Sequence, residues 1–180
     1  MGKKSRRMAL CGMMAALGTA LMLMGGVIPM ATFCCPMLAT LTLIPVLLEY
    51  GRKWTLWVWA ATAALSLMLS PDKESALLLA FLGWYPALKP RLDKIRIRVL
   101  RAAAKLGVFN LAAGAMLLCI AFVLRMDAVM AEYTAMGIAG FIAFWLLANF
   151  TMLVYDRLLP AMAVVYIRKI RPMISGGRGK

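Results

Sequence analysis

Histidine is absent from the 180-residue sequence, and acidic residues are scarce, with 7 Asp and Glu against 21 Lys and Arg. Histidine is the commonest metal ligand and the commonest general base near neutral pH, so its absence removes most hydrolase and metalloenzyme mechanisms. Acidic residues are also missing from the middle of the long apolar segments, which argues against a proton-driven transporter with its own carboxylate relay. The sequence contains no phosphate-binding loop. We therefore expect no enzymatic activity, no metal site and no bound cofactor.

Cysteine is also rare, and the four cysteines do not form a recognisable site. Cys11, Cys34, Cys35 and Cys119 lie inside apolar runs without the CxxC spacing of zinc or redox sites. Their density is far below that of a disulfide-rich scaffold. We interpret them as small hydrophobic residues.

Hydrophobic residues, by contrast, make up 64% of the sequence, and the mean hydropathy is +0.84. A soluble domain of this length could not bury so much apolar surface in one core, so lipid must cover much of it. Charged residues account for 16% of the chain and form short clusters between the apolar runs. This pattern predicts an all-α, multi-pass integral protein of the cell membrane, with the lipid bilayer as its first partner.

Six apolar segments are candidates for transmembrane helices: 8–28, 33–48, 54–70, 75–88, 106–124 and 135–155. Pro36 and Pro45 predict that the second span is short or kinked. The fourth segment is short enough to be a re-entrant piece. We nevertheless predict that it crosses, because the basic loop that follows would otherwise face outward.

The predicted domain is therefore a compact six-helix bundle over residues 8–171, between a basic cytoplasmic N-terminus at 1–7 and a flexible tail at 172–180. Only Lys73 and Arg125 fall in predicted outer loops, and all the other Lys and Arg lie inside or at the inner edge. This distribution places both termini in the cytoplasm. Residues 95–105 are expected to lie along the cytoplasmic surface before the fifth span.

The formal net charge of +14 is interpreted as this orientation signal, facing anionic lipid headgroups, because the charges gather at the ends of apolar segments. A nucleic-acid partner is not expected, since its binding would require a basic face interleaved with stacking aromatic residues.

Polar residues of the predicted outer loops form a candidate ligand-binding region, which we call the outer rim. They either line a pocket that opens outward or simply face water as loop residues. The outer rim consists of Thr32, Ser70, Asp72, Glu74, Arg125, Asp127, Glu132 and Tyr133.

Two further groups lie within the apolar segments. Gly12, Ala16 and Ala20 share one helical face, and such small residues serve either internal packing or close docking of a partner membrane subunit. Asn110 and Asn149 are expected at similar depth in the fifth and sixth spans, so they either hydrogen-bond each other or contact a ligand.

The topology, the small residues at 12–20 (GMMAALGTA) and the proline-punctuated stretch at 36–51 (PMLATLTLIPVLLEYG) resemble the substrate-binding S component of energy-coupling factor (ECF) transporters. The resemblance covers residues 8–171. It implies capture of a vitamin or a metal ion from outside, with the ligand site toward the outer face. The absence of histidine argues against a cobalt or nickel site and favours a small organic solute. The resemblance also implies docking through the first segment onto a coupling transmembrane subunit driven by two ATPases. The alternative is a non-transporting accessory or scaffold membrane subunit.

Overall fold

The computed structural model describes residues 3–25, 34–125 and 127–172. All regular elements in this part of the chain are helical. Three helices are long and apolar enough to cross a membrane, namely Lys4–Gly25, Arg98–Phe122 and Gly137–Lys169. The expectation of an all-α chain with membrane-spanning helices is confirmed to that extent, and this composition supports a membrane protein.

The chain forms two compact units. Unit 1 contains residues 1–90 and 157–180, and unit 2 contains residues 91–156. The first part of unit 1 consists of helices α1 (Lys3–Gly25), α2 (Cys34–Leu41), α3 (Leu43–Tyr50), α4 (Arg52–Leu69) and α5 (Lys73–Leu82), followed by α6 (Tyr85–Leu92).

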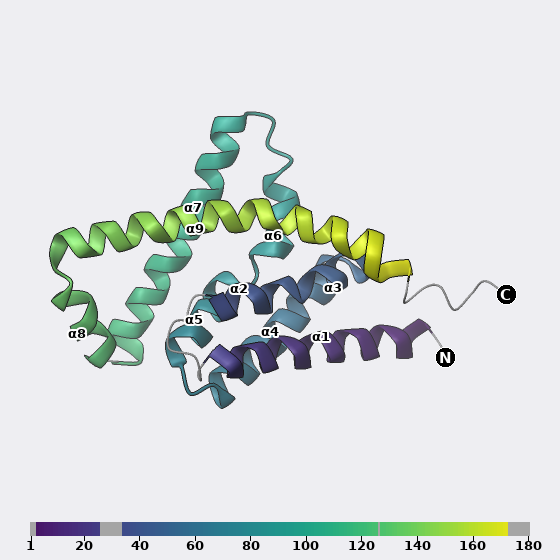
Figure 1. Ribbon diagram of the computed structural model, residues 1–180, viewed down its shortest axis with the longest axis horizontal. Helices are drawn as coiled ribbons and strands as arrows, with labels where there is room; N and C mark the ends of the chain where they lie inside the picture. The colour runs from purple at the N-terminus through teal and green to yellow at the C-terminus, as the bar shows by residue number, and fades with distance from the viewer. Residues whose placement is uncertain (1–2, 26–33, 126, 173–180) are drawn as a thin grey trace. The chain divides into compact units, whose positions relative to one another are not determined.

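Helices α1 to α5 pack side by side in unit 1 (Figure 1), where α1 contacts α2 and α4, and α4 contacts α3 and α5. Two small clusters of buried residues join these helices. Cys11, Leu43, Val46 and Val58 link α1, α3 and α4, whereas Met22, Ala39, Ala76 and Leu79 link α1, α2 and α5. The buried positions of Cys11 and Cys35 agree with their interpretation as small hydrophobic residues.

The predicted second span is divided into α2 and α3 at Thr42. Pro45 lies in the first turn of α3 and has no N–H to donate to the carbonyl of Leu41, so the preceding helix cannot continue regularly. Thr42 closes the break because its hydroxyl and its backbone N–H both donate to Ala39 O, at 2.7 and 3.2 Å. The kink expected from the prolines is thus a break between two helices at Thr42, three residues before Pro45.

A tight reversal at Gly51 joins α3 to α4. Gly51 has φ 78°, a conformation that glycine adopts without steric cost, and its N–H donates to Leu47 O at 3.1 Å. Glu49, Arg52 and Lys53 therefore lie together at one end of unit 1.

The predicted fourth span is also divided, into α5 and α6, with the break at Gly83 and Trp84. Pro86 lies in the first turn of α6, where its missing N–H costs no helical hydrogen bond. Trp59 of α4 packs on Gly83 and donates its Nε1–H to Leu79 O at 3.0 Å. Whether these two short helices together cross the membrane remains a prediction.

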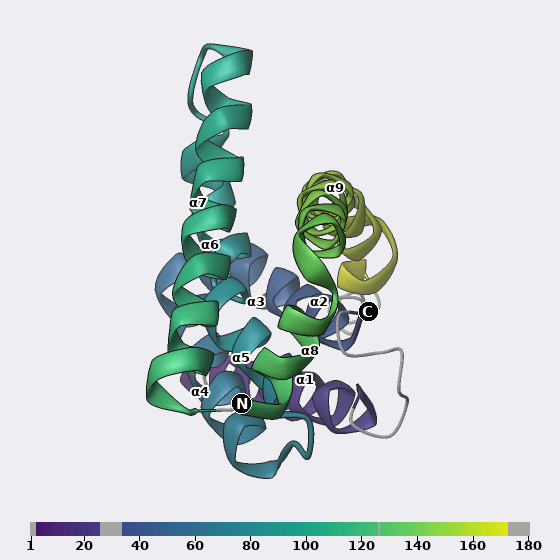
Figure 2. The same ribbon diagram turned by 90° about the vertical axis from the view of Figure 1, so that its left-hand side faces the viewer.

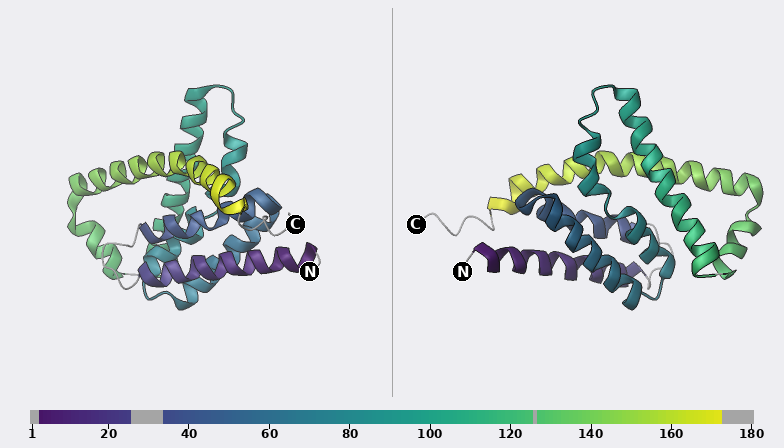
Figure 3. Two further views of the ribbon diagram at one scale, coloured as in Figure 1. Left: turned by 45° about the vertical axis from the view of Figure 1, so that its right-hand side comes forward. Right: turned by 180° about the vertical axis from the view of Figure 1, so that it is seen from behind.

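Unit 2 is built from α7 (Arg98–Leu118), a π-helical turn (Cys119–Val123), α8 (Asp127–Ala135) and the first part of α9 (Gly137–Val165). Within this unit, α7 and α9 run at a steep angle to each other, since Figure 2 shows α7 along its length and α9 nearly end-on. Helix α8 connects them in the chain (Figure 3). The last helical turn, Tyr166–Ile170, continues α9 and belongs to unit 1. Residues 98–105 are part of α7 rather than a separate surface helix, since the run Ala102–Ala104 strongly favours an uninterrupted helix.

Candidate functional site

An amide cluster lies where α7 and α9 cross in unit 2. Asn110 Nδ2 donates to Asn149 Oδ1 at 2.8 Å, so the interhelical contact expected from the sequence is present. Trp145 Nε1 donates to Asn110 Oδ1 at 2.7 Å, and Asn149 Nδ2 donates to the backbone oxygen of Trp145 at 2.8 Å. Asn110 Nδ2 also donates to Leu106 O at 2.8 Å. Both amides therefore have donor and acceptor partners inside the unit, which favours a structural role for the pair.

A charged cluster lies close to this crossing in the chain. Lys105 Nζ is 2.6 Å from Asp93 Oδ1 and 2.8 Å from Asp156 Oδ2, and Lys105 is only 8% exposed. A buried ammonium is costly unless it is paired, and the two carboxylates supply that pairing. Asp156 thus pairs with a residue on a neighbouring helix rather than with the adjacent Arg157. The cluster ties the loop before α7, α7 itself and α9 together.

In the outer rim, Asp72 has a clear structural role at the start of α5. Its Oδ1 accepts hydrogen bonds from the backbone N–H groups of Glu74 and Ser75, at 3.0 and 3.2 Å. This is an N-cap, which satisfies two of the free donors at a helix start. Ser70 Oγ donates to Asp72 O at 3.1 Å and fixes the turn before the helix.

The remaining rim residues are distributed over both units. Glu74 follows Asp72 in unit 1, whereas Arg125 lies in unit 2 and is exposed, with φ 46°. Asp127, Glu132 and Tyr133 belong to α8, but their side chains lie outside the described part of the structure, and Thr32 lies outside the described residues altogether. A single rim pocket therefore remains a prediction.

The proposed docking face of α1 is exposed in unit 1. Gly12, Ala16 and Ala20 are all exposed, and a Cβ added at Gly12 would have no atom within 4 Å. Met13 and Leu17 beside them are 60% and 49% exposed. The stripe therefore makes no close helix contact within unit 1.

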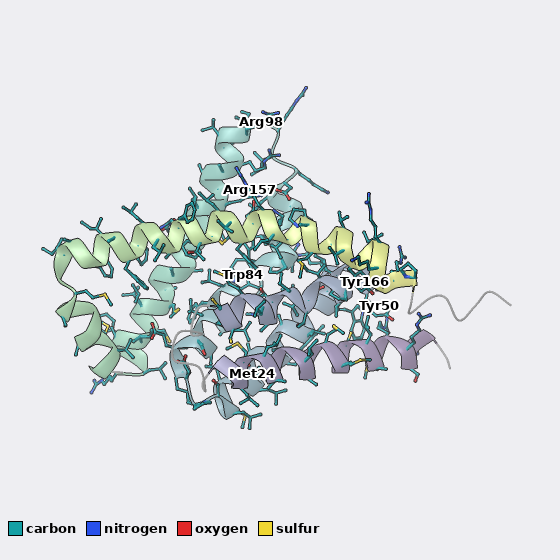
Figure 4. All side chains as sticks on the ribbon, in the orientation of Figure 1. Met24, Tyr50, Trp84, Arg98, Arg157 and Tyr166 are labelled. Carbon is teal, nitrogen blue, oxygen red and sulfur yellow. The ribbon has the colours of Figure 1, made fainter. Side chains whose placement is uncertain are left out.

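One end of unit 1 is basic. The start of α1, the Gly51 turn and the last turn of the described chain lie at this end, where Figure 4 labels Tyr50 and Tyr166 next to each other. Arg171 Nε is 3.1 Å from Glu49 Oε1, and the Arg7 guanidinium lies 4.0 Å from the centre of the Trp54 ring. Cations from three separate segments thus gather at the same end of the unit.

Trp145 and Lys105 were not predicted from the sequence as partners of the polar residues. Trp145 lies four residues before Asn149, and this i, i+4 spacing on a helix was an available signal. The ion pairs of Lys105 connect residues that are far apart in the chain, so no local sequence pattern predicts them. The capping role of Asp72 was also not predicted, although an Asp that precedes a helical segment is a known signal of a helix N-terminus.

Comparison with known proteins gives no match to any family model, to any curated protein or to any solved structure.

Proposed function

We propose that this chain is the membrane-embedded, substrate-binding subunit of an ECF-type ABC importer that captures a small organic solute, such as a vitamin, from outside the cell. In this proposal the helices form six spans. These are α1, α2 with α3, α4, α5 with α6, α7, and α9. Both termini are cytoplasmic. This orientation is supported by the cations that gather at one end of unit 1. They come from the start of α1, the Gly51 turn and the last described turn.

The exposed face of α1 carries the functional part of the proposal. Gly12, Ala16 and Ala20 leave a shallow strip along a helix that is itself long and apolar enough to span a membrane. In lipid, small residues allow another helix to approach closely, and they are characteristic of interfaces between membrane helices. The neighbouring exposed Met13 and Leu17 supply adaptable packing for a partner, which we infer to be the coupling transmembrane subunit with its two ATPases.

The experiment that tests the proposal is purification of the tagged protein from its native membrane in a gentle detergent, with mass spectrometry of everything that co-purifies. We expect a coupling membrane subunit, two ATPases and a small organic molecule. Ala16→Leu should remove the coupling subunit by blocking close helix approach while leaving membrane insertion intact. Ala61→Leu, at an exposed position on α4, is the matched control and should keep the partners.

A non-transporting accessory or scaffold subunit is the second candidate. Its specific support is that three candidate ligand-binding residues form hydrogen bonds within the protein. Asp72 caps α5, and the side-chain amides of Asn110 and Asn149 bond to each other. Recovery of the protein alone, or with an unrelated complex, would favour this second function over the importer subunit.

A further inference from the structure

Residues 91–101 comprise the end of α6, the loop before α7 and the first turn of α7, and they carry a large net positive charge. None of the five cations in this stretch forms an ion pair within the described residues, and four of them are exposed. They are Arg91, Lys94, Arg96, Arg98 and Arg101.

Acidic residues offset only a small part of this charge. The first turn of α7 contains none, and the one acidic residue of the stretch, Asp93, is 2.6 Å from the Lys105 ammonium. Because Lys105 is shared between Asp93 and Asp156, Asp93 offsets at most one of the five neighbouring cations, and most of the positive charge remains available to an external anion. The contact between Asp93 and Lys105 also holds the loop against α7, so the cations are presented by an ordered backbone.

Apolar side chains are interleaved with the cations at the same place. Ile97, Val99 and Leu100 are 62%, 78% and 55% exposed. Figure 4 labels Arg98 at the point where the chain turns from the loop into α7. Exposed aliphatic residues alternating with cations are typical of surfaces that insert into the boundary between headgroups and acyl chains.

We propose that residues 91–101 form a docking surface for the phosphate groups of anionic phospholipids. The cations bind the phosphates, and Ile97, Val99 and Leu100 enter the adjoining acyl region. A bilayer is the occupant that fits, because the stretch leads directly into Arg98–Phe122, a helix long and apolar enough to span a membrane. The stretch has no aromatic residue on which nucleic-acid bases could stack.

The test uses the full-length protein in a neutral detergent, titrated with phosphatidylglycerol or with zwitterionic phosphatidylcholine, with bound lipids counted by native mass spectrometry. We expect tighter binding of phosphatidylglycerol. Each cation near an anionic surface strengthens binding about fivefold, so Lys94→Gln/Arg96→Gln/Arg98→Gln should weaken it on the order of a hundredfold. The control Lys4→Gln/Lys53→Gln/Arg168→Gln removes three exposed cations of unit 1 and should have a much smaller effect.

A second variant tests the apolar contribution. Ile97→Ser/Val99→Ser keeps every charge and should still weaken phosphatidylglycerol binding severalfold, because the aliphatic contact with the acyl region is lost. Equal losses in the test and control triple variants would overturn the proposal, since they would indicate general charge attraction. Unchanged lipid binding in the test triple variant, together with loss of a co-purifying acidic protein, would overturn it in favour of a protein partner.

Discussion

Asn110 on α7 and Asn149 on α9 face each other, with Asn110 Nδ2 2.8 Å from Asn149 Oδ1. A second hydrogen bond returns from Asn149 Nδ2 to Asn110 Oδ1 at 3.3 Å. Together with the ion pair between Lys105 and Asp156, this amide pair connects α7 to α9 within unit 2. An unpaired amide in an apolar environment is costly, which makes the pair a determinant of how the two helices cross.

Replacing Asn110 with Leu should destabilise the protein by about 1 to 2 kcal/mol, because Asn149 and the Trp145 indole N–H each lose a partner. Thermal unfolding in detergent, followed by tryptophan fluorescence, measures this effect. Thr151→Val is the matched control, since the Thr151 hydroxyl bonds only to Leu147 O of its own helix. A double-mutant cycle with Asn110→Ala and Asn149→Ala should give a coupling energy of about 0.6 kcal/mol or more. Additive effects would contradict the pairing.

Lys105→Met should leave Asp93 and Asp156 without their shared cation. We expect a loss of about 2 kcal/mol, which arises mainly from Asp156, because the Asp93 side chain is 41% exposed and stays hydrated. Adding Asp156→Asn should restore most of the stability by removing the buried negative charge that Lys105 balances in the wild type. Lys94→Met, at an exposed cation without an ion pair, is the control for loss of positive charge alone. No rescue by Asp156→Asn would show that the ion pair is not the source of the effect.

Gly83 has no room for a side chain, because an added Cβ would clash with the backbone oxygen of Leu79 and would also lie 2.8 Å from Trp59 Cδ1. Gly83→Ala should therefore force α4 and α5 apart locally and cost about 1 to 3 kcal/mol. Gly107→Ala in α7, where no atom lies within 4 Å of the added Cβ, should instead be neutral or stabilising by up to about 1 kcal/mol. Comparison of the two unfolding midpoints checks the packing of α4 on α5, and equal midpoints would count against it.

Asp72 offers a way to separate capping from ligand binding. Asp72→Ala should cost about 1 kcal/mol by removing the acceptor for the first N–H groups of α5. Asp72→Asn keeps an acceptor oxygen and should preserve most of the stability. If the carboxylate also contacts a charged solute, the Asn variant will fold normally but bind that solute more weakly. Equal stability of the Ala variant and the wild type would rule out the capping role.

The sequence predicted the helical fold and the presence of helices long and apolar enough to cross a membrane, because hydropathy follows from large solvation costs. The contact between Asn110 and Asn149 was one of the two alternatives that the sequence indicated, because both residues were expected at similar depth. The sequence did not predict the helix break at Gly83, which depends on the indole of Trp59 on another helix. The ion pairs of Lys105 were missed for the same reason, since their three residues come together only through tertiary packing.

The arrangement of the six spans rests most heavily on α5 and α6, which are short and separated by a break. Short epitope tags inserted separately after Pro71 and after Lys94 in the full-length protein, with antibody binding compared between intact and permeabilised cells, test it directly. We predict that the tag after Pro71 is accessible in intact cells and that the tag after Lys94 becomes accessible only after permeabilisation. Access to both tags in intact cells would show that α5 and α6 do not cross, and would contradict the six-span arrangement.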